Sequence, residues 1–264
     1  MPKKRFNFKN ILLIIFCILP ITIPPYCSQN FSFSAWGDII IYSLLNAISF
    51  DFKGIMLYGQ VAMFVVFILL VILRNKIGKL FTLIVALSYL FYAVTQNIAI
   101  SEEYGLSIVT SNFITMLLVS TAWFYDLFAS RTKYTFKNLT KKNWYLIILA
   151  IFCFWWPLNM NTAQPSFALK GFFYSMSSIS FCPMTPIFLI ILILCKPSIN
   201  LITYKITAIG GIVIGFFNIV TIFHPSSFYS GLYHIPLFAI SIYAFLDKSN
   251  LNANKLYSEF VTKS

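Results

Sequence analysis

The chain has 264 residues, of which 59% are hydrophobic and 10% are charged, whereas roughly 25% of the residues of a soluble domain are charged. This composition excludes a soluble globular protein and predicts a chain whose main partner is the lipid bilayer. The net charge of +12 does not indicate nucleic-acid binding, because the basic residues form short clusters between apolar runs and no continuous patch.

The first apolar run, residues 11–26, follows a basic start at residues 1–10. A positive start before a short apolar run is typical of a signal peptide, but the end of this run, PPYC, lacks the small residues of a cleavage site. We therefore expect an uncleaved anchor, with a cleaved signal as the alternative. Residues 28–54 follow outside the membrane, and residues 34–49 within them predict either a helix on the outer surface or a short re-entrant segment.

Residues 55–246 contain seven further apolar runs, most of them close to the ~20 residues that a membrane-spanning helix needs. The predicted spans cover residues 55–73, 80–100, 105–129, 144–159, 172–195, 200–222 and 230–246. The sequence therefore predicts an all-α fold: a polytopic transmembrane helical bundle of about eight spans, or seven if the first is cleaved, plus one short outer interfacial helix. No separate soluble domain is expected, so residues 1–264 form a single integral membrane domain.

The basic residues indicate the orientation of these spans. All but two of the 19 Lys and Arg residues fall on the side of the chain termini, and the two exceptions are Lys53 and Lys170. Short cytoplasmic loops collect Lys and Arg, so both termini, including the polar tail at residues 247–264, are predicted to be cytoplasmic. The expected location is the plasma membrane of a bacterium or an archaeon.

Neutral polar residues gather in the outer half of the predicted spans. No carboxylate lies at the centre of a span, which argues against an ion pump or an aspartyl protease built on buried acids. Tyr89, Tyr92 and Gln96 share a helix face, since they are spaced i, i+3 and i+7. The polar set either lines an outward-facing pocket or hydrogen-bonds between helices, and it comprises Gln60, Gln96, Asn112, Asn218 and His234.

A proline-containing stretch, residues 175–186, is the most unusual local sequence. Pro183 and Pro186 lack amide protons. The carbonyls of Ile179 and Cys182 therefore lose their helical donors near the middle of the membrane. The stretch predicts either a kinked helix or a broken one in which Pro183 begins a second segment, and broken helices often mark solute sites in transporters.

The next predicted span carries two glycines, Gly211 and Gly215, at the spacing that allows close helix packing. Their expected partner is the proline-containing helix that precedes them. Near the outer end of residues 144–159, the sequence Trp155-Trp156-Pro157 predicts an interfacial aromatic belt.

The cysteines and histidines predict no cofactor, no metal and no catalytic residue. Five cysteines without a CxxC motif argue against a disulfide framework or a zinc site, although Cys27 and Cys182 could pair if the fold brings them together. His224 and His234 flank a short outer loop, and two histidines at this separation are a weak metal signal.

Residues 181–197 and 234–237 resemble a family of uncharacterised bacterial integral membrane proteins. Those proteins carry a Cys-Pro-x-Thr motif in a late span, followed by a proline-bounded inner loop, and Cys182, Pro183 and Thr185 match the motif. The resemblance implies a polytopic membrane fold. It implies no activity, because the family has none assigned.

These observations favour a small-solute permease or a solute-binding membrane module. Its expected site faces outside and comprises polar residues of five predicted spans: Gln96, Asn112, Cys182, Thr185, Asn218 and His234. The alternative is a sensor or accessory subunit that packs against a membrane protein partner through the abundant Phe and Tyr side chains. A third reading is an intramembrane enzyme with Cys182 as nucleophile or His224 and His234 as base or metal ligands, for which no orienting third group is predicted.

Overall fold

The structure is a computed structural model, and it describes residues 15, 18, 22–159, 162, 164–223 and 227–247. Several predictions therefore lie outside the described residues. They concern the basic start, most of the first apolar run, His224 and the tail beyond residue 247.

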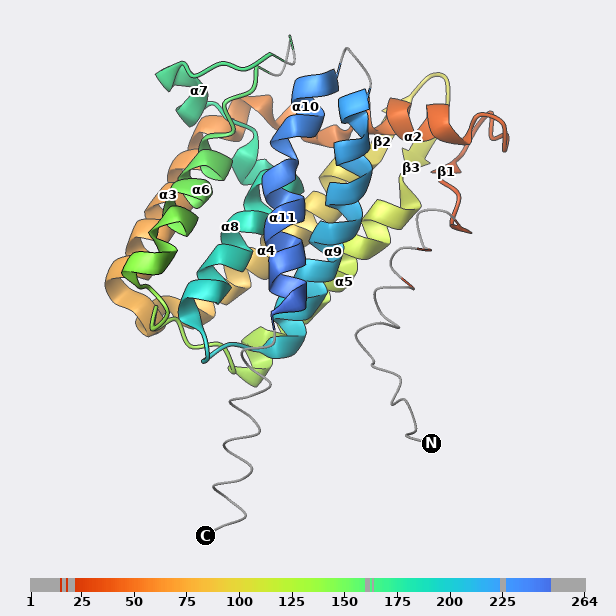
Figure 1. The fold of residues 1–264 in the computed structure, drawn as a ribbon. Coiled ribbons are helices and arrows are strands. Elements are labelled where there is room, and N and C mark those ends of the chain that lie inside the picture. The colour runs from red at the N-terminus through yellow and green to blue at the C-terminus, as the bar shows by residue number, and fades with distance from the viewer. Residues whose placement is uncertain are drawn as a thin grey trace, which may run out of the picture.

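Most of the described chain is helical, and the helices form one bundle (Figure 1). The longer helices are α3 (Met56–Leu73), α4 (Gly78–Asn97), α5 (Thr110–Ala129), α8 (Phe181–Cys195) and α9 (Leu201–Ile219). The shorter ones are α2 (Trp36–Leu45), α6 (Trp144–Trp155), α7 (Leu169–Phe173), α10 (Phe228–Tyr233) and α11 (Ile235–Leu246). Short 3-10 helices are η1 (Ile48–Ile55), η2 (Arg74–Ile77), η3 (Lys141–Asn143), η4 (Ser177–Ile179) and η5 (Val220–Phe223).

The two ends of the bundle differ in their connections. Figure 1 shows α2, α7 and α10 at one end, which we call the upper end. The connections between α3 and α4, between α5 and α6, and between α8 and α9 lie at the opposite, lower end. These lower connections carry the basic residues Arg74, Lys76, Arg131, Lys133 and Lys196, whereas Lys170 lies in α7.

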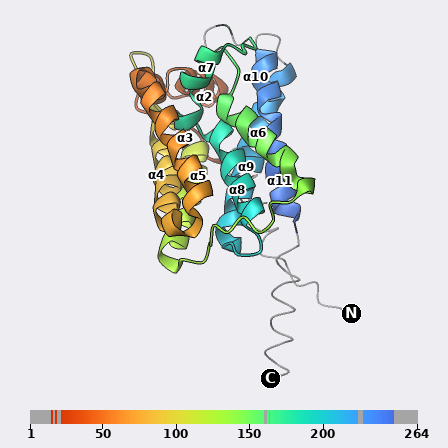
Figure 2. The same cartoon turned by 90° about the vertical axis from the view of Figure 1, so that its left-hand side faces the viewer.

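Four helical segments of the described chain are long and apolar enough to cross a membrane: Met56–Asn97, Thr110–Ala129, Leu201–Phe223 and Phe228–Leu246. A fifth arises if the bent pair Leu169–Ile179 and Phe181–Cys195 counts as one span. The predicted number of about eight is therefore not confirmed, although the fold is compatible with a multi-pass membrane protein. The first segment contains α3 and α4, which fold back on each other at η2 (Figure 2).

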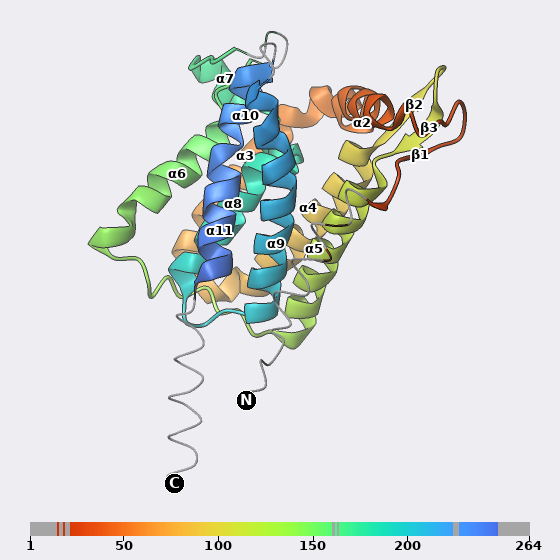
Figure 3. The same cartoon turned by 45° about the vertical axis from the view of Figure 1, so that its right-hand side comes forward.

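One predicted span, residues 144–159, is shorter in the structure than expected. Its helix, α6, has 12 residues, and 12 residues extend about 18 Å. This is well short of the ~30 Å hydrocarbon core of a bilayer. Figure 3 shows that α6 also leans away from the other helices at its lower end.

A small antiparallel sheet at the upper end corrects the all-α prediction. Its strands are β1 (Tyr26–Cys27), β2 (Ile98–Ser101) and β3 (Gly105–Ile108), in the order β1-β3-β2. The helices predicted at residues 80–100 and 105–129 therefore stop at Asn97 and start at Thr110. The isoleucines of β2 and β3 favour an extended chain, and Gly105 at φ +62° allows the turn between them.

The predicted outer helix at residues 34–49 corresponds to α2, which packs on this sheet. The Ser43 hydroxyl donates to the Ser107 hydroxyl of β3 over 2.9 Å, and both side chains are buried. The helix is therefore held by protein contacts as well as by its expected place at the membrane surface.

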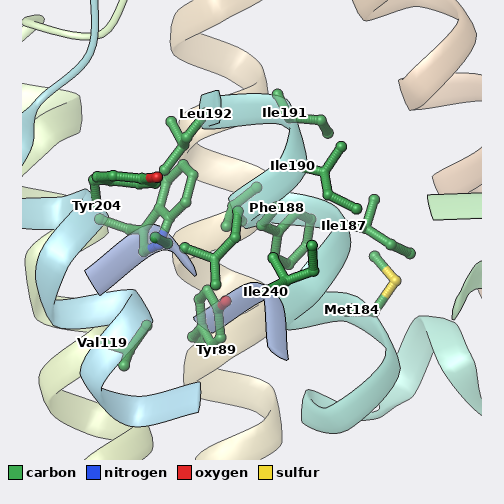
Figure 4. Packing of buried hydrophobic residues seen from close by; sticks show 14 of the residues in the cluster. Tyr89, Val119, Met184, Ile187, Phe188, Ile190, Ile191, Leu192, Tyr204 and Ile240 are labelled. Carbon is green, nitrogen blue, oxygen red and sulfur yellow. The ribbon is translucent and has the colours of Figure 1, made fainter. Parts of the chain in front are cut away.

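Helix α8 supplies many of the side chains that pack in the core of the bundle (Figure 4). Every residue of α8 except Cys182 is buried. The Phe188 ring contacts Tyr89 of α4 at 5.6 Å between centroids and Trp123 of α5 at 6.1 Å. This all-round burial explains why the sequence of α8 is apolar on every face.

The close-packing glycines of α9 face α11. A Cβ on Gly211 would lie 2.1 Å from the Ser241 hydroxyl, and a Cβ on Gly215 would lie 3.2 Å from the Phe238 main chain. The glycines thus let the main chains of α9 and α11 approach each other. The prediction that they pack against the proline-containing helix, α8, is wrong. The glycine that faces away from α11 is Gly210, which packs against Val119 of α5.

A buried lysine holds the lower end of α11. The Lys205 ammonium, on α9, donates to the carbonyls of Ala244, Phe245 and Asp247 at 2.6–2.9 Å. These carbonyls belong to the last turn of α11 and the residue after it. A cation there satisfies groups that the helix leaves unpaired and complements the helix dipole.

The neighbouring lysine, Lys196, forms an ion pair with the Asp247 side chain. Burial lowers the pKa of Lys196 to about 8, which leaves the ammonium protonated at neutral pH. The protonated Lys196 therefore keeps its ion pair with Asp247. Together with the contacts of Lys205, this pair joins the lower ends of α8, α9 and α11.

A second polar network ties α5 to α9 at the lower end. The buried Asp126 carboxylate accepts hydrogen bonds from the main chain and hydroxyl of Thr132 and from the Asn200 amide. Asn200 is also the N-cap of α9, where its side chain accepts from the Ile202 N–H. The Asp126 carboxylate is therefore held by hydrogen bonds from two other segments of the protein.

Candidate functional site

A cavity of about 240 Å³ lies at the upper end, beside the start of α8. Its wall is built from η1, the upper ends of α4, α5 and α9, and α10. The polar side chains of the wall are Ser49, Gln96, Asn97, Asn112, Ser180, Cys182, Asn218, Ser230 and His234. We call this space the upper cavity.

The upper cavity brings together most of the residues that the sequence singles out. Five of the six predicted site residues line it: Gln96, Asn112, Cys182, Asn218 and His234. Thr185 does not, because it lies deeper in α8, is fully buried, and accepts a hydrogen bond from the Tyr89 hydroxyl over 3.2 Å. Thr185 thus takes part in helix packing.

The main chain before α8 is broken and not simply kinked. The segment formed by α7 and η4 meets α8 at 85°, and Ser180 between them is extended. The second segment begins at Phe181, two residues before Pro183, which was expected to begin it. Pro183 lies in the first helical turn, where an N–H has no intrahelical partner in any case, whereas Pro186 lies inside α8.

Gln96 stabilises this break. Its carbonyl oxygen accepts from the Phe181 N–H over 2.9 Å, and its amide group donates to the Ser180 hydroxyl over 2.8 Å. A side chain of α4 therefore caps the first turn of α8. Both functional groups of Gln96 are used in this way, so Gln96 shapes the upper cavity more than it offers a free group to it.

Tyr92 of α4 and Gln60 of α3 hold the segment that precedes the break. The Tyr92 hydroxyl donates to the Ser178 carbonyl over 3.0 Å. The Gln60 amide donates to the Phe154 carbonyl over 2.9 Å, and its oxygen lies 2.9 Å from the Ser177 hydroxyl. Tyr92 and Gln60 therefore form hydrogen bonds between segments of the bundle. They do not line the upper cavity.

Asn97 is a polar residue of the wall that the sequence analysis missed. Its amide nitrogen donates to the carbonyls of Tyr92 and Ala93 and lies 3.2 Å from the Met116 sulfur. These contacts orient the side chain, and they leave its oxygen without a hydrogen-bond partner among the described residues although the residue is 0% exposed. A buried acceptor of this kind costs about 1–3 kcal/mol unless a donor reaches it. The only sequence signal was its position next to Gln96.

Two further asparagines contribute amides from α5 and α9. Asn112 is half-buried, and its side chain makes no hydrogen bond with the part of the chain that the structure describes. The Asn218 amide nitrogen donates to the Ile214 carbonyl over 2.7 Å. The Asn112 amide is therefore not used to hold other described segments in place.

His234 offers an acceptor to the upper cavity. Its Nδ1 lies 2.7 Å from the Ser230 carbonyl, which assigns the proton to Nδ1 and leaves Nε2 as an acceptor. The Trp156 ring packs edge-on against the imidazole at 5.5 Å. Trp156 is itself buried in the wall, so the expected interfacial belt is wrong for this residue.

Thiol and metal chemistry find little support in the described part of the chain. Cys182 in the wall and Cys27 in β1 are both free thiols, so they do not form the disulfide that the sequence allowed. No group of three His, Cys, Asp or Glu side chains among the described residues could hold a metal ion.

No known protein family, curated protein or solved structure matches this chain. The resemblance noted from the Cys-Pro-x-Thr motif thus stays a prediction, and the function has to be argued from the upper cavity itself.

Proposed function

We propose that the chain is an integral membrane protein that binds a small, uncharged polar solute in the upper cavity, as a permease or a solute-binding module. One observation carries this proposal. Neutral polar side chains from helices far apart in the sequence line one cavity, and the buried Asn97 oxygen among them has no partner in the part of the chain that the structure describes.

The lining indicates the chemistry of the solute. No charged side chain lines the upper cavity among the described residues, so a charged solute would lose its hydration without compensation. The oxygen of Asn97 and Nε2 of His234 both accept hydrogen bonds. A solute with hydroxyl or amide donors therefore fits this wall, and Met116 and Ile214 supply apolar contact.

The volume limits the size of the solute. At about 30 Å³ for each water molecule of the liquid, 240 Å³ corresponds to about eight waters. A molecule of about that many non-hydrogen atoms fills the same space. Small polyols, amides and similar neutral metabolites are of this size.

The position of the cavity supports transport in addition to binding. It lies beside the free start of a broken helix, and broken helices at membrane depth are a recurrent element of solute sites in transporters. With the basic lower end on the cytoplasmic side, the upper cavity faces outside. The chain would then take up or sense a solute from the external medium.

The proposal is tested by the thermal unfolding of the detergent-purified protein in a panel of uncharged polyols and amides. A solute at ~100 times its dissociation constant adds about 2.7 kcal/mol to the unfolding free energy. We expect the shift to disappear in Asn112→Leu, which removes an amide at similar volume. It should persist in Thr185→Val, which changes a predicted site residue outside the cavity.

Two results would contradict the proposal. One is the absence of any stabilising solute for the wild-type protein. The other is a solute whose shift survives Asn112→Leu but is lost in Thr185→Val. For a solute that binds, uptake into proteoliposomes separates a permease, which equilibrates the solute across the membrane, from a binding module, which does not.

A further inference from the structure

A second and larger cavity lies on the side of the bundle, between α3 and α6. Its volume is about 500 Å³, within the roughly 300–1,000 Å³ range of small-molecule sites. Figure 2 shows α3 and α6 standing apart with α8 between and behind them. We call this space the side groove.

The side groove is apolar along its length. Its floor is α8, through the buried side chains of Ile187, Ile190 and Leu194. The walls are formed by α3 and α6, where Val71 and Ile151 are exposed. A water-filled groove of this composition would be unfavourable, so an apolar molecule is its natural occupant.

The upper end of the side groove is closed by three aromatic rings. Phe172 of α7 contacts Phe154 of α6 at 5.6 Å between centroids and Phe64 of α3 at 6.0 Å. All three residues line the groove. The side groove is therefore closed at its upper end by these rings.

The lower end of the side groove carries one charge. Arg74 is the only charged residue that lines the groove among the described residues, and its guanidinium has no ion pair or hydrogen bond with them. Its main chain has φ +51° and ψ −125°, a conformation that favours glycine and that arginine adopts at a cost. An unpaired guanidinium at the mouth of an apolar channel suits an anionic group attached to an apolar chain.

We infer that the side groove binds one acyl chain of an anionic phospholipid, with the phosphate of the headgroup at Arg74 and the end of the chain at the three aromatic rings. From Phe64 to Arg74, α3 extends about 15 Å. This is half of the ~30 Å hydrocarbon core, the depth that one acyl chain covers. The inference requires the chain to cross a membrane but does not depend on the upper cavity or its solute.

The charge at Arg74 favours a lipid over an apolar helix of a partner protein as the occupant. An anionic headgroup on an apolar chain matches both the apolar lining and the guanidinium, whereas an apolar helix would leave that charge without a counterion. A single acyl chain is narrower and unbranched, so it can follow the groove without separating α3 from α6.

The test is native mass spectrometry of the delipidated full-length protein, titrated with palmitoyl-oleoyl phosphatidylglycerol or with phosphatidylcholine of the same chains. The expected result is one tightly bound phosphatidylglycerol, held about fivefold more strongly than phosphatidylcholine, the factor that corresponds to ~1 kcal/mol for one basic residue. Arg74→Gln should remove this preference, and Arg74→Lys should retain most of it. Lys76→Gln, which changes the same short turn outside the groove, should have no effect.

A matched pair of variants tests the chain-binding part. Val71→Trp fills the groove from its wall and should weaken the binding of both lipids at least tenfold. Ile72→Trp places the same bulk on the neighbouring exposed position outside the groove and should leave binding unchanged. Both positions are exposed on α3, so neither variant is expected to impair folding.

Three outcomes would overturn the inference. The first is equal binding of the two lipids in the wild type, and the second is binding that Val71→Trp leaves intact. The third is a dimer of the chain that Val71→Trp dissociates, which would make the groove an interface between copies. Competition by glycerol 3-phosphate at equal concentration would also count against the acyl chain as the bound group.

Discussion

The upper and lower ends of the bundle use polar residues in opposite ways. At the lower end, Lys205, Lys196 and Asp126 are buried, and each is paired with a specific group on another segment. In the upper cavity, the lining polar side chains are neutral, and the Asn97 oxygen and the Asn112 amide lack partners in the described chain. At the lower end, charged groups join the helices. In the upper cavity, neutral groups are left available to a ligand.

This difference follows from the cost of burying each group. An unpaired buried charge costs far more than an unpaired amide. A protein can therefore keep an amide unpaired in a cavity for a ligand, whereas a buried lysine has to be fully satisfied. The comparison predicts that changes at the lower end affect stability, whereas changes in the upper cavity affect binding.

The largest effect is expected for Lys205→Met. The change removes the donor to three carbonyls at the end of α11, and bonds from a charged donor contribute about 1.5–3 kcal/mol each. We expect a loss of about 3 kcal/mol or more in the unfolding free energy, measured by thermal unfolding in detergent. Lys79→Met, at an exposed position of the same end, is the control. Equal stability of the two variants would show that the lower end is not held by this lysine.

A smaller effect is expected for Gly211→Ala, because its Cβ would overlap the Ser241 hydroxyl at 2.1 Å. Overpacking of this kind costs about 1–3 kcal/mol. Ser241→Ala removes the overlapping hydroxyl oxygen, which has no hydrogen-bond partner among the described residues, so the double variant should regain part of the loss. Additive losses in the double-mutant cycle would show that α9 and α11 do not meet at these residues.

Gln96→Leu is expected to reduce stability by about 1–2 kcal/mol, because α8 loses the acceptor for its first N–H. Gln96→Glu keeps an acceptor at the helix start, where a negative charge is favourable, and should lose less. Chemical unfolding of both variants measures the difference. A Glu variant as unstable as the Leu variant would mean that the donated bond to Ser180, and not the cap, holds the break together.

The smallest effect on stability is expected for Asn112→Leu, within about 0.5 kcal/mol of the wild type. Its side chain makes no hydrogen bond with the described chain, so folding does not depend on its amide. The same thermal unfolding experiment checks this value in the absence of solute. A large loss would place Asn112 among the structural residues and would break the contrast between the two ends.

Much of the candidate site could be predicted from residue type and depth alone. Gln96, Asn112, Asn218 and His234 are polar residues at similar depth in separate apolar runs, and helices of one bundle bring residues of equal depth together. Thr185 was grouped with them because it belongs to the proline-containing stretch at residues 175–186. One helical turn below the start of α8, however, it lies beneath the cavity and contacts Tyr89 instead.

The misses share a physical cause. The third strand of the sheet, β1, pairs with β3 although it is far away in the sequence. Gly211 packs against α11 and not against α8, because α11 is the helix that lies against the glycine face of α9 in the folded bundle. Asn97 stood out only after Tyr92, Ala93 and Met116 were known to take its donor and leave its acceptor.

The sequence by itself determined the apolar helical character of the chain, most of its turns and the basic clusters at one end. These are local properties, because hydrophobic runs and missing amide protons act on the segment that carries them. Only the tertiary structure decided that α8 is broken at 85°, that its side chains pack in the core, and that a cavity opens beside its first turn. Those features depend on side chains of other helices, such as Gln96, that satisfy the main chain where the helix is interrupted.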